Sequence, residues 1–348
     1  MKSILKESLQ IGIVICVIIG IGYACKKNRF KKEVFLEEMY TYKAEPEINA
    51  AINAIELLQN SWATYGANTT GDNFSTVTSN YVDVANQMEE ISFYNLGDVS
   101  AVYVFSRFYK TSIDTNGIID AYNMQESFAE NDIANYVNTR KGLYALEYLF
   151  YSTSFADSLT EPKFINFIDA HLSYLHSSST EFQNTWNIYQ KNFIKNDGEG
   201  VSDSYNIVIN RIIHVLEDLI NKRIADPLDG NDHKLAVGHY SNKALEKIKI
   251  QVLQLQQVYL GIGTETFNSV YNNLRKKNKK LADKVSDKFE EAVTFGNGMS
   301  YEMDYYIHTT SAPLIDYKNL LIELLAFFKG DIQDELNIII TFGDTDGD

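Results

Sequence analysis

Two oxygen-bearing side chains three residues apart, Tyr144 and Glu147, form the pattern in this chain with the clearest potential for chemistry. On a helix, such residues share a face, with Cβ atoms about 5–6 Å apart. A phenol titrates near 10, so it binds a metal only when a strongly acidic cation displaces its proton. Phenolate and carboxylate oxygens are hard ligands that suit Fe(III), which makes Tyr144 and Glu147 candidate ligands for iron or another metal ion. The competing interpretation is that Tyr144 is a core residue with its hydroxyl satisfied and that Glu147 accepts a hydrogen bond from a neighbouring donor.

A similar pair recurs 70 residues later, where His214 and Glu217 are again three apart. Aligning the two stretches places His214 at the position of Tyr144 and Glu217 at that of Glu147. If the chain consists of duplicated halves, the second pair completes a site with the first. The alternative is that any two amphipathic helices can be aligned by their apolar stripes, and that His214 is a surface histidine or one whose hydrogen bonds are satisfied.

Together these pairs predict a ligand pocket between two domains. A buried carboxylate needs a partner, because desolvating it alone is costly or forces it to protonate, and the available cations are Arg140, Arg211 and Arg223. A glycine within a helix costs about 1 kcal/mol relative to alanine, so Gly142 is expected to permit a close helix contact. The residues predicted to share the pocket are Gly142, Tyr144, Glu147, His214, Glu217 and Arg223.

The sequence shows no complete catalytic constellation, and we predict no catalytic residues. It lacks the HExxH pair of zinc peptidases, and both cysteines lie in the first 25 residues, so the body has no thiol nucleophile. Residues 344–348 begin like a calcium loop but stop short of its 12 positions, which favours a solvated acidic tail. The other histidines show no ligand spacing with carboxylates; they are His171, His176, His233, His239 and His308.

Apolar residues recur at three-to-four-residue spacing along most of the chain, beginning with Ile48, Ala51 and Ile55. This period is typical of amphipathic helices, and strand-like alternation is scarce, so the predicted fold class is all-α. Thr180 and Gln183 form a capping-box pattern that predicts a helix start. After a first helix from about residue 47, helices are predicted at about 75–92, 129–152, 161–177, 180–196, 203–225, 241–260, 276–293 and 313–335.

A polar loop at 196–200 is the predicted domain boundary. About four helices on each side of it would pack as two four-helix-bundle-like domains lying side by side. The predicted division is an N-terminal bundle at 41–198, a C-terminal bundle at 199–340 and an acidic tail at 341–348.

The N-terminus has the pattern of an export signal. Lys2 and Lys6 precede a 14-residue apolar run at 11–24, which is shorter than the about 20 residues that cross a bilayer. The Ala24–Cys25 junction resembles a bacterial lipobox, which predicts a signal peptide at 1–24, lipidation of Cys25 and a basic tether at 25–40 beside lipid headgroups. Ordinary cleavage or an uncleaved anchor are the alternatives, and each leaves the body outside the cytoplasm. The predicted location is the cell envelope, lipid-anchored in the outer membrane and facing the periplasm or the surface.

The charge balance excludes one class of partner. The 348 residues carry a formal net charge of -15, whereas binding to a phosphate backbone depends on clustered Lys and Arg that release counterions. No nucleic-acid partner is expected. The chain is 45% hydrophobic and 22% charged, as a folded globular protein is.

Residues 139–150 resemble the signature helix of the imelysin family, whose motif is GxHxxE, although this chain has Tyr144 where the motif has His. Other stretches are similar in the family's order, namely Trp186–Tyr189, Asn210, Glu217 and 223–228. The ending at 336–348 is similar to the I-T-F-x-D-x-D-G-D tail of imelysin-like lipoproteins of the Bacteroidetes type. The resemblance covers nearly all of residues 40–348.

The resemblance implies two helical bundles with a site near their interface, in an exported protein associated with iron acquisition. It favours a lipid-anchored binding protein for iron, haem or metal uptake, with the membrane and an outer-membrane uptake system as partners. Two alternatives stay open. One is a metallopeptidase, since the family takes its name from a peptidase, and the other is a surface scaffold whose aromatic residues contact polysaccharide.

Overall fold

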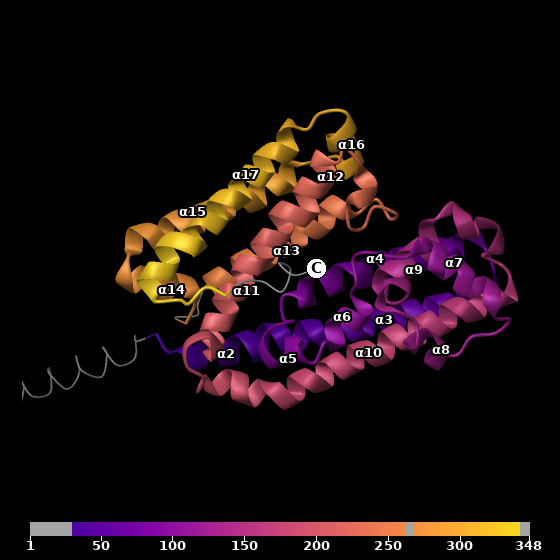
Figure 1. Cartoon of the computed structure of the whole chain (residues 1–348), viewed down its shortest axis with the longest axis horizontal. Helices are drawn as coiled ribbons and strands as arrows, with labels where there is room; N and C mark the ends of the chain where they lie inside the picture. The colour runs from indigo at the N-terminus through magenta and orange to yellow at the C-terminus, as the bar shows by residue number, and fades with distance from the viewer. Residues whose placement is uncertain (1–29, 262–267, 342–348) are drawn as a thin grey trace, which may run out of the picture.

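The computed structural model describes residues 30–261 and 268–341, and every regular element within those ranges is a helix. The all-α prediction is confirmed. Figure 1 shows two elongated groups of helices side by side, and the chain passes from one to the other between α10 and α11. The first group comprises α2 (Lys32–Met39), η1 (Tyr40–Ala44), α3 (Glu45–Ala67), α4 (Gly71–Ser92), α5 (Gly97–Ala101), α6 (Val104–Phe108), α7 (Thr115–Met124), α8 (Glu130–Ala134), η2 (Asn138–Arg140), α9 (Leu143–Tyr151), η3 (Thr153–Ser158) and α10 (Pro162–Lys195).

The second group begins after the connection at 196–199, in which the predicted boundary between residues 198 and 199 falls. Its long helices α11, α13, α15 and α17 run along the group, with short elements at both ends. It comprises η4 (Gly200–Ser202), α11 (Ser204–Asp218), η5 (Leu219–Ala225), α12 (Asp226–Asp229), η6 (His233–Leu235), α13 (Ala244–Leu260), α14 (Val270–Lys277), α15 (Lys279–Gly298), α16 (Met303–His308), α17 (Ala312–Phe327), η7 (Phe328–Ile332) and α18 (Gln333–Leu336).

Short polar side chains start several of these helices. The Thr70 side chain accepts a hydrogen bond from the Asn73 N–H at 3.3 Å, and the Asp203 carboxylate accepts one from the Asn206 N–H at 2.8 Å. Each cap satisfies a backbone donor that lacks a partner in the first helical turn. The cap at Asp203 therefore defines the entry into α11, which carries several residues of the site.

Two predicted helix boundaries were wrong. The segment 161–196, predicted as two helices, is the single helix α10, and the Thr180 hydroxyl donates to the His176 carbonyl inside it at 2.9 Å instead of capping a new start. The segment 129–152, predicted as one helix, is divided into α8, η2 and α9. Gly142 lies just before α9 with φ 82° and ψ −158°, so it is a left-handed break and not a mid-helix residue.

Aromatic side chains fill the core of the first group. Trp62 and Trp186 are almost completely buried, and each indole N–H donates to a backbone carbonyl, of Ile165 at 3.2 Å and of Tyr94 at 3.1 Å. These bonds allow large rings to be buried without leaving a polar group unpaired. His171 is also fully buried, and burial lowers its pKa to about 3, so it packs as a neutral ring.

The predicted tether at 25–40 is too long. Helix α2 begins at Lys32 and buries Phe35, Leu36 and Met39, which recur at helical spacing and join the core. The Lys32 ammonium pairs with Asp203 at 2.7 Å. Any free tether therefore ends before residue 32. The predicted boundary was set by the run of basic residues and did not take account of the apolar stripe that follows it. Cys25 and the predicted signal peptide lie outside the described residues.

Within the described parts of the chain, no helix combines the length and apolar character that crossing a bilayer requires. The described backbone ends at Thr341, so the rest of the predicted acidic tail lies beyond it. The segment before that end is fixed to α11. Asn206 accepts from the Ile339 N–H at 2.8 Å, and Asn210 accepts from the Thr341 N–H at 2.7 Å.

Candidate functional site

A fully buried carboxylate, that of Glu89 on α4, organises the interface between the two groups of helices. It accepts hydrogen bonds from the hydroxyls of Tyr109, at 2.7 Å, and Tyr144. The Gln251 amide on α13 also donates to it, at 2.7 Å, and the Arg223 guanidinium in η5 lies 3.5 Å away. Because Gln251 and Arg223 come from the second group, this one carboxylate connects both.

Arg223 is itself only 5% exposed, and its guanidinium makes three polar contacts. One nitrogen faces Glu89, a second donates to the Tyr109 hydroxyl at 3.0 Å, and Nε donates to Asp218 at 3.1 Å. Such charge-assisted bonds are the strong ones in proteins. The Tyr109 hydroxyl therefore accepts a hydrogen bond from Arg223 and donates one to Glu89. Together with the Arg223–Glu89 ion pair, these bonds form a closed ring of polar contacts.

The electrostatics of this cluster favour a charged Glu89. Burial raises the pKa of its carboxyl, but the charges of Arg223 and Lys247 and the two tyrosine hydroxyls outweigh burial, so the pKa lies below its usual value. For Tyr144, burial and the negative charge of Glu89 both hold the phenol pKa well above its usual value. Tyr144 is thus a protonated donor to Glu89.

Glu147, one turn further along α9, has partners of its own. It is 2% exposed, and one carboxylate oxygen accepts from both the backbone N–H of Ser241, at 3.0 Å, and the Ser241 hydroxyl. Burial raises the pKa of Glu147. The buried Lys247 ammonium lies 5.5 Å from the centre of the Tyr144 ring, and its Nζ has no hydrogen-bond partner among the described residues.

These contacts correspond to the second of the two interpretations of Tyr144 and Glu147, a satisfied hydroxyl and a carboxylate with a neighbouring donor. Forming a phenolate at Tyr144 would require overcoming both burial and the charge of Glu89. Metal binding by Tyr144 and Glu147 stays a prediction.

The structure brings only part of the predicted pocket together. Tyr144 and Arg223 meet through Glu89. His214 lies on α11, 3.0 Å from the Thr341 carbonyl, whereas Glu217 forms an ion pair with Lys329 of its own group.

Gly142 has a structural role at this interface. A Cβ atom there would lie 2.2 Å from the Phe108 carbonyl oxygen. The glycine therefore allows the start of α9 to lie directly against the end of α6.

A cleft of about 540 Å³ opens between the two groups beside the Glu89 cluster. Arg211, His214 and Asp218, at i, i+3 and i+7 on α11, line it, together with Arg223 of η5 and Lys110 of the segment after α6. The lining of the cleft therefore has three cationic side chains and one carboxylate, although the net charge of the chain is -15. Tyr109 also lines the cleft, whereas Tyr144 does not.

Sequence reasoning missed Glu89, Tyr109, Gln251 and Lys247. A signal for Glu89 was present, because on α4 it follows Tyr81 and Ala85 at four-residue spacing and so falls on the apolar stripe. A carboxylate on such a stripe indicates a buried group with a partner. The other three could be recognised only from their neighbours in space.

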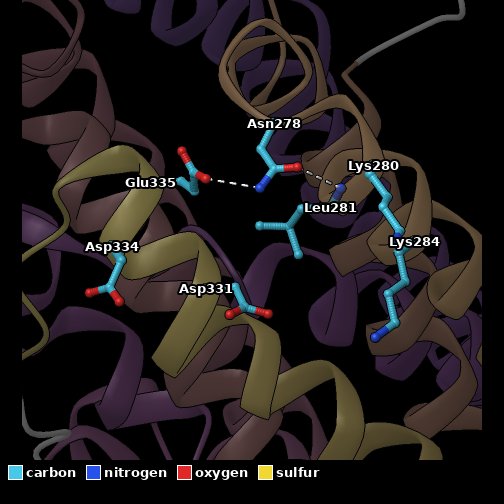
Figure 2. A pocket seen from close by; sticks show the side chains of 7 residues that line it. All are labelled: Asn278, Lys280, Leu281, Lys284, Asp331, Asp334 and Glu335. Carbon is cyan, nitrogen blue, oxygen red and sulfur yellow. Dashed lines mark hydrogen bonds between the residues drawn. The ribbon is translucent and has the colours of Figure 1, made fainter.

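A second hollow, of about 480 Å³, lies between α15 and the η7–α18 segment (Figure 2). Asn278 caps α15 by accepting from the Leu281 N–H at 3.1 Å and donates to Glu335 at 2.9 Å. Lysines face it from α15 and carboxylates from the other side. Two of its polar side chains, Asn278 and Glu335, are engaged in this helix cap, and it lies outside the interface between the groups, so we take the cleft between the bundles as the candidate site.

The fold and cleft define the class of protein as a two-bundle helical protein with a polar inter-bundle site. The chain belongs to the imelysin family, since the family model described as Peptidase_M75, Imelysin, matches residues 44–311. No curated protein matches the chain.

Two solved structures show the same fold. An imelysin-like protein from Psychrobacter arcticum 273-4 superposes with a TM-score of 0.76 at 14% identity, covering 89% of this chain and 97% of that one. A protein from Parabacteroides distasonis ATCC 8503, named as a candidate iron-regulated protein A precursor, superposes with a TM-score of 0.73 at 12% identity, covering 87% and 94%. At these identities the similarity concerns the fold alone.

Proposed function

We propose that the chain is an exported, lipid-anchored binding protein that holds an anionic iron chelate, such as haem, in the cleft between its two bundles and serves iron uptake. The observation that carries this proposal is the basic lining of the cleft in an acidic chain: Lys110 and Arg211 lie beside Arg223, whose guanidinium is already paired with Glu89 and Asp218. Guanidinium groups recognise carboxylates, the acidic groups that haem and citrate carry. The cleft volume of about 540 Å³ lies in the range of small-molecule sites. The Parabacteroides relative is named as an iron-regulated protein, which also supports a role in iron uptake.

Filling the cleft tests the proposal. Ser100 of α5 lines it with a small side chain, so Ser100→Trp is expected to weaken the binding of haem or ferric citrate by at least about 10-fold, which corresponds to 1.4 kcal/mol. The measurement is a titration of the purified protein, followed by absorbance for haem and by calorimetry for ferric citrate.

The matched control is Ser75→Trp, which places the same ring at an exposed position of α4 away from the cleft. It should bind like the wild type. Binding of neither chelate by the wild type, or equal binding by the Ser100→Trp variant, would contradict the proposal.

We also propose that Cys25 carries the lipid anchor. The support is the short apolar run that ends in Ala24–Cys25, followed by basic residues before α2. In cells supplied with a labelled fatty acid, the wild type is expected to incorporate the label and Cys25→Ala to lose it. The control is Cys16→Ala, which changes the other cysteine, inside the leader, and should retain the label. Label on the Cys25→Ala protein would rule out this anchor.

A further inference from the structure

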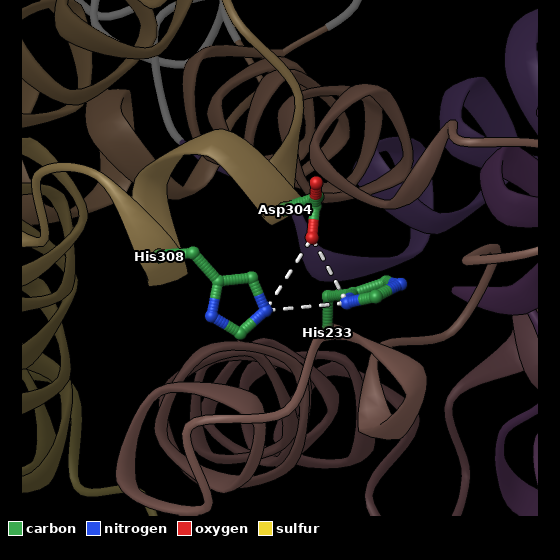
Figure 3. A group of neighbouring side chains, drawn as sticks. All are labelled: His233, Asp304 and His308. Atoms are coloured by element: carbon green, nitrogen blue, oxygen red, sulfur yellow. Dashed lines mark hydrogen bonds and ion pairs between the residues drawn. The ribbon is translucent and has the colours of Figure 1, made fainter.

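Three side chains that are far apart in the sequence meet at the end of the second bundle, outside the cleft. His233 belongs to η6, and Asp304 and His308 lie one turn apart on α16 (Figure 3). His233 Nδ1 and Asp304 Oδ1 are 2.9 Å apart, Asp304 Oδ1 and His308 Nε2 are 3.4 Å apart, and the two histidine nitrogens are 3.4 Å apart. Three potential ligand atoms thus form a nearly equilateral triangle.

We propose that His233, Asp304 and His308 bind a divalent first-row transition metal ion of the zinc type. Nitrogen and carboxylate ligands lie about 2.0–2.2 Å from zinc, so two of them on a tetrahedral ion are about 3.3–3.5 Å apart. Two of the three separations have this value, and the third is shorter by a few tenths of an ångström. A small movement of Asp304 away from His233 would complete one face of a tetrahedron.

The types of ligand select the class of metal. Imidazole nitrogen is a borderline ligand that suits Zn, Cu and Ni, whereas Mg and Ca prefer sites made only of oxygen. The i, i+4 spacing of Asp304 and His308 places both on one face of α16, and His233 approaches that face from η6. Three protein ligands leave a fourth position of a tetrahedral ion for water.

The cluster is accessible to an ion from solvent. The side chains of His233, Asp304 and His308 are 33%, 53% and 43% exposed. None of the three lines the inter-bundle cleft, so the proposed metal site is separate from the cleft.

The test is a zinc titration of the full-length protein in detergent, after removal of metal with a chelator, against a chromophoric competitor. The wild type is expected to bind one Zn²⁺ at this site. His233→Gln and His308→Gln should each weaken binding by at least about 100-fold, since even outer partners of metal ligands are worth about 10- to 100-fold. Cobalt bound to the wild type should show the intense visible absorption of a tetrahedral ion, and the double variant should not.

The matched control is His176→Gln. His176 is also partly exposed and lies 3.4 Å from a carboxylate, that of Glu56, but it has no second histidine in that contact. This variant should bind zinc like the wild type, and every protein compared has the same cysteines. The proposal is overturned if the wild type binds zinc no more tightly than the His233→Gln, His308→Gln double variant, or if His176→Gln weakens binding equally.

Discussion

Replacing Glu89 with alanine is expected to lower the free energy of unfolding by about 3–5 kcal/mol, the range for removing one partner of a buried ion pair. Arg223, 5% exposed, would keep its charge in the interior without the carboxylate that faces it at 3.5 Å. The hydroxyls of Tyr109 and Tyr144 and the amide of Gln251 would lose their acceptor at the same time. Urea denaturation followed by circular dichroism measures the change.

An exposed pair of the same chemistry provides the control. Arg107 and Glu181 are 3.1 Å apart, with side chains 43% and 51% exposed. Glu181→Ala should therefore cost at most about 1 kcal/mol. If Glu89→Ala costs no more than Glu181→Ala, the Glu89 cluster does not hold the two bundles together.

Features that depend on neighbouring residues in the sequence were predicted well. The three-to-four apolar period indicated an all-α chain, which the structure confirms. The period could not show that α10 continues through Thr180. A threonine there can cap a helix or bond back within one, and the Thr180 hydroxyl bonds back to the His176 carbonyl of the preceding turn.

The residues of the site were harder to predict because their partners are remote. Glu89 is 134 positions from Arg223 and 162 from Gln251, and no local pattern encodes those contacts. His233 and His308 are 75 positions apart, so no ligand spacing in the sequence relates them. Tyr144 and Glu147 could be identified from the sequence because they are three residues apart. Whether their oxygens bind a metal or form hydrogen bonds within the core depends on neighbours that are remote in the sequence, Glu89 and Ser241.

Gly142→Ala is expected to lower the free energy of unfolding by at least about 3 kcal/mol. The backbone at Gly142 has φ 82° and ψ −158°, a region essentially restricted to glycine, where another residue costs about 1–3 kcal/mol. The new Cβ would also lie 2.2 Å from the Phe108 carbonyl oxygen and 2.7 Å from its carbonyl carbon. These are backbone atoms, so the clash cannot be relieved by a rotamer change.

The matched substitution is Gly330→Ala in η7. Gly330 has helical backbone, and a Cβ there meets no atom within 4 Å. Alanine should therefore stabilise the protein by about 0.5–1 kcal/mol, the usual cost of glycine inside a helix. Opposite signs for the two variants in urea denaturation are the expected result. A Gly142→Ala protein as stable as the wild type would mean that α9 can move away from Phe108, and the Tyr144 hydroxyl would then no longer be fixed against Glu89.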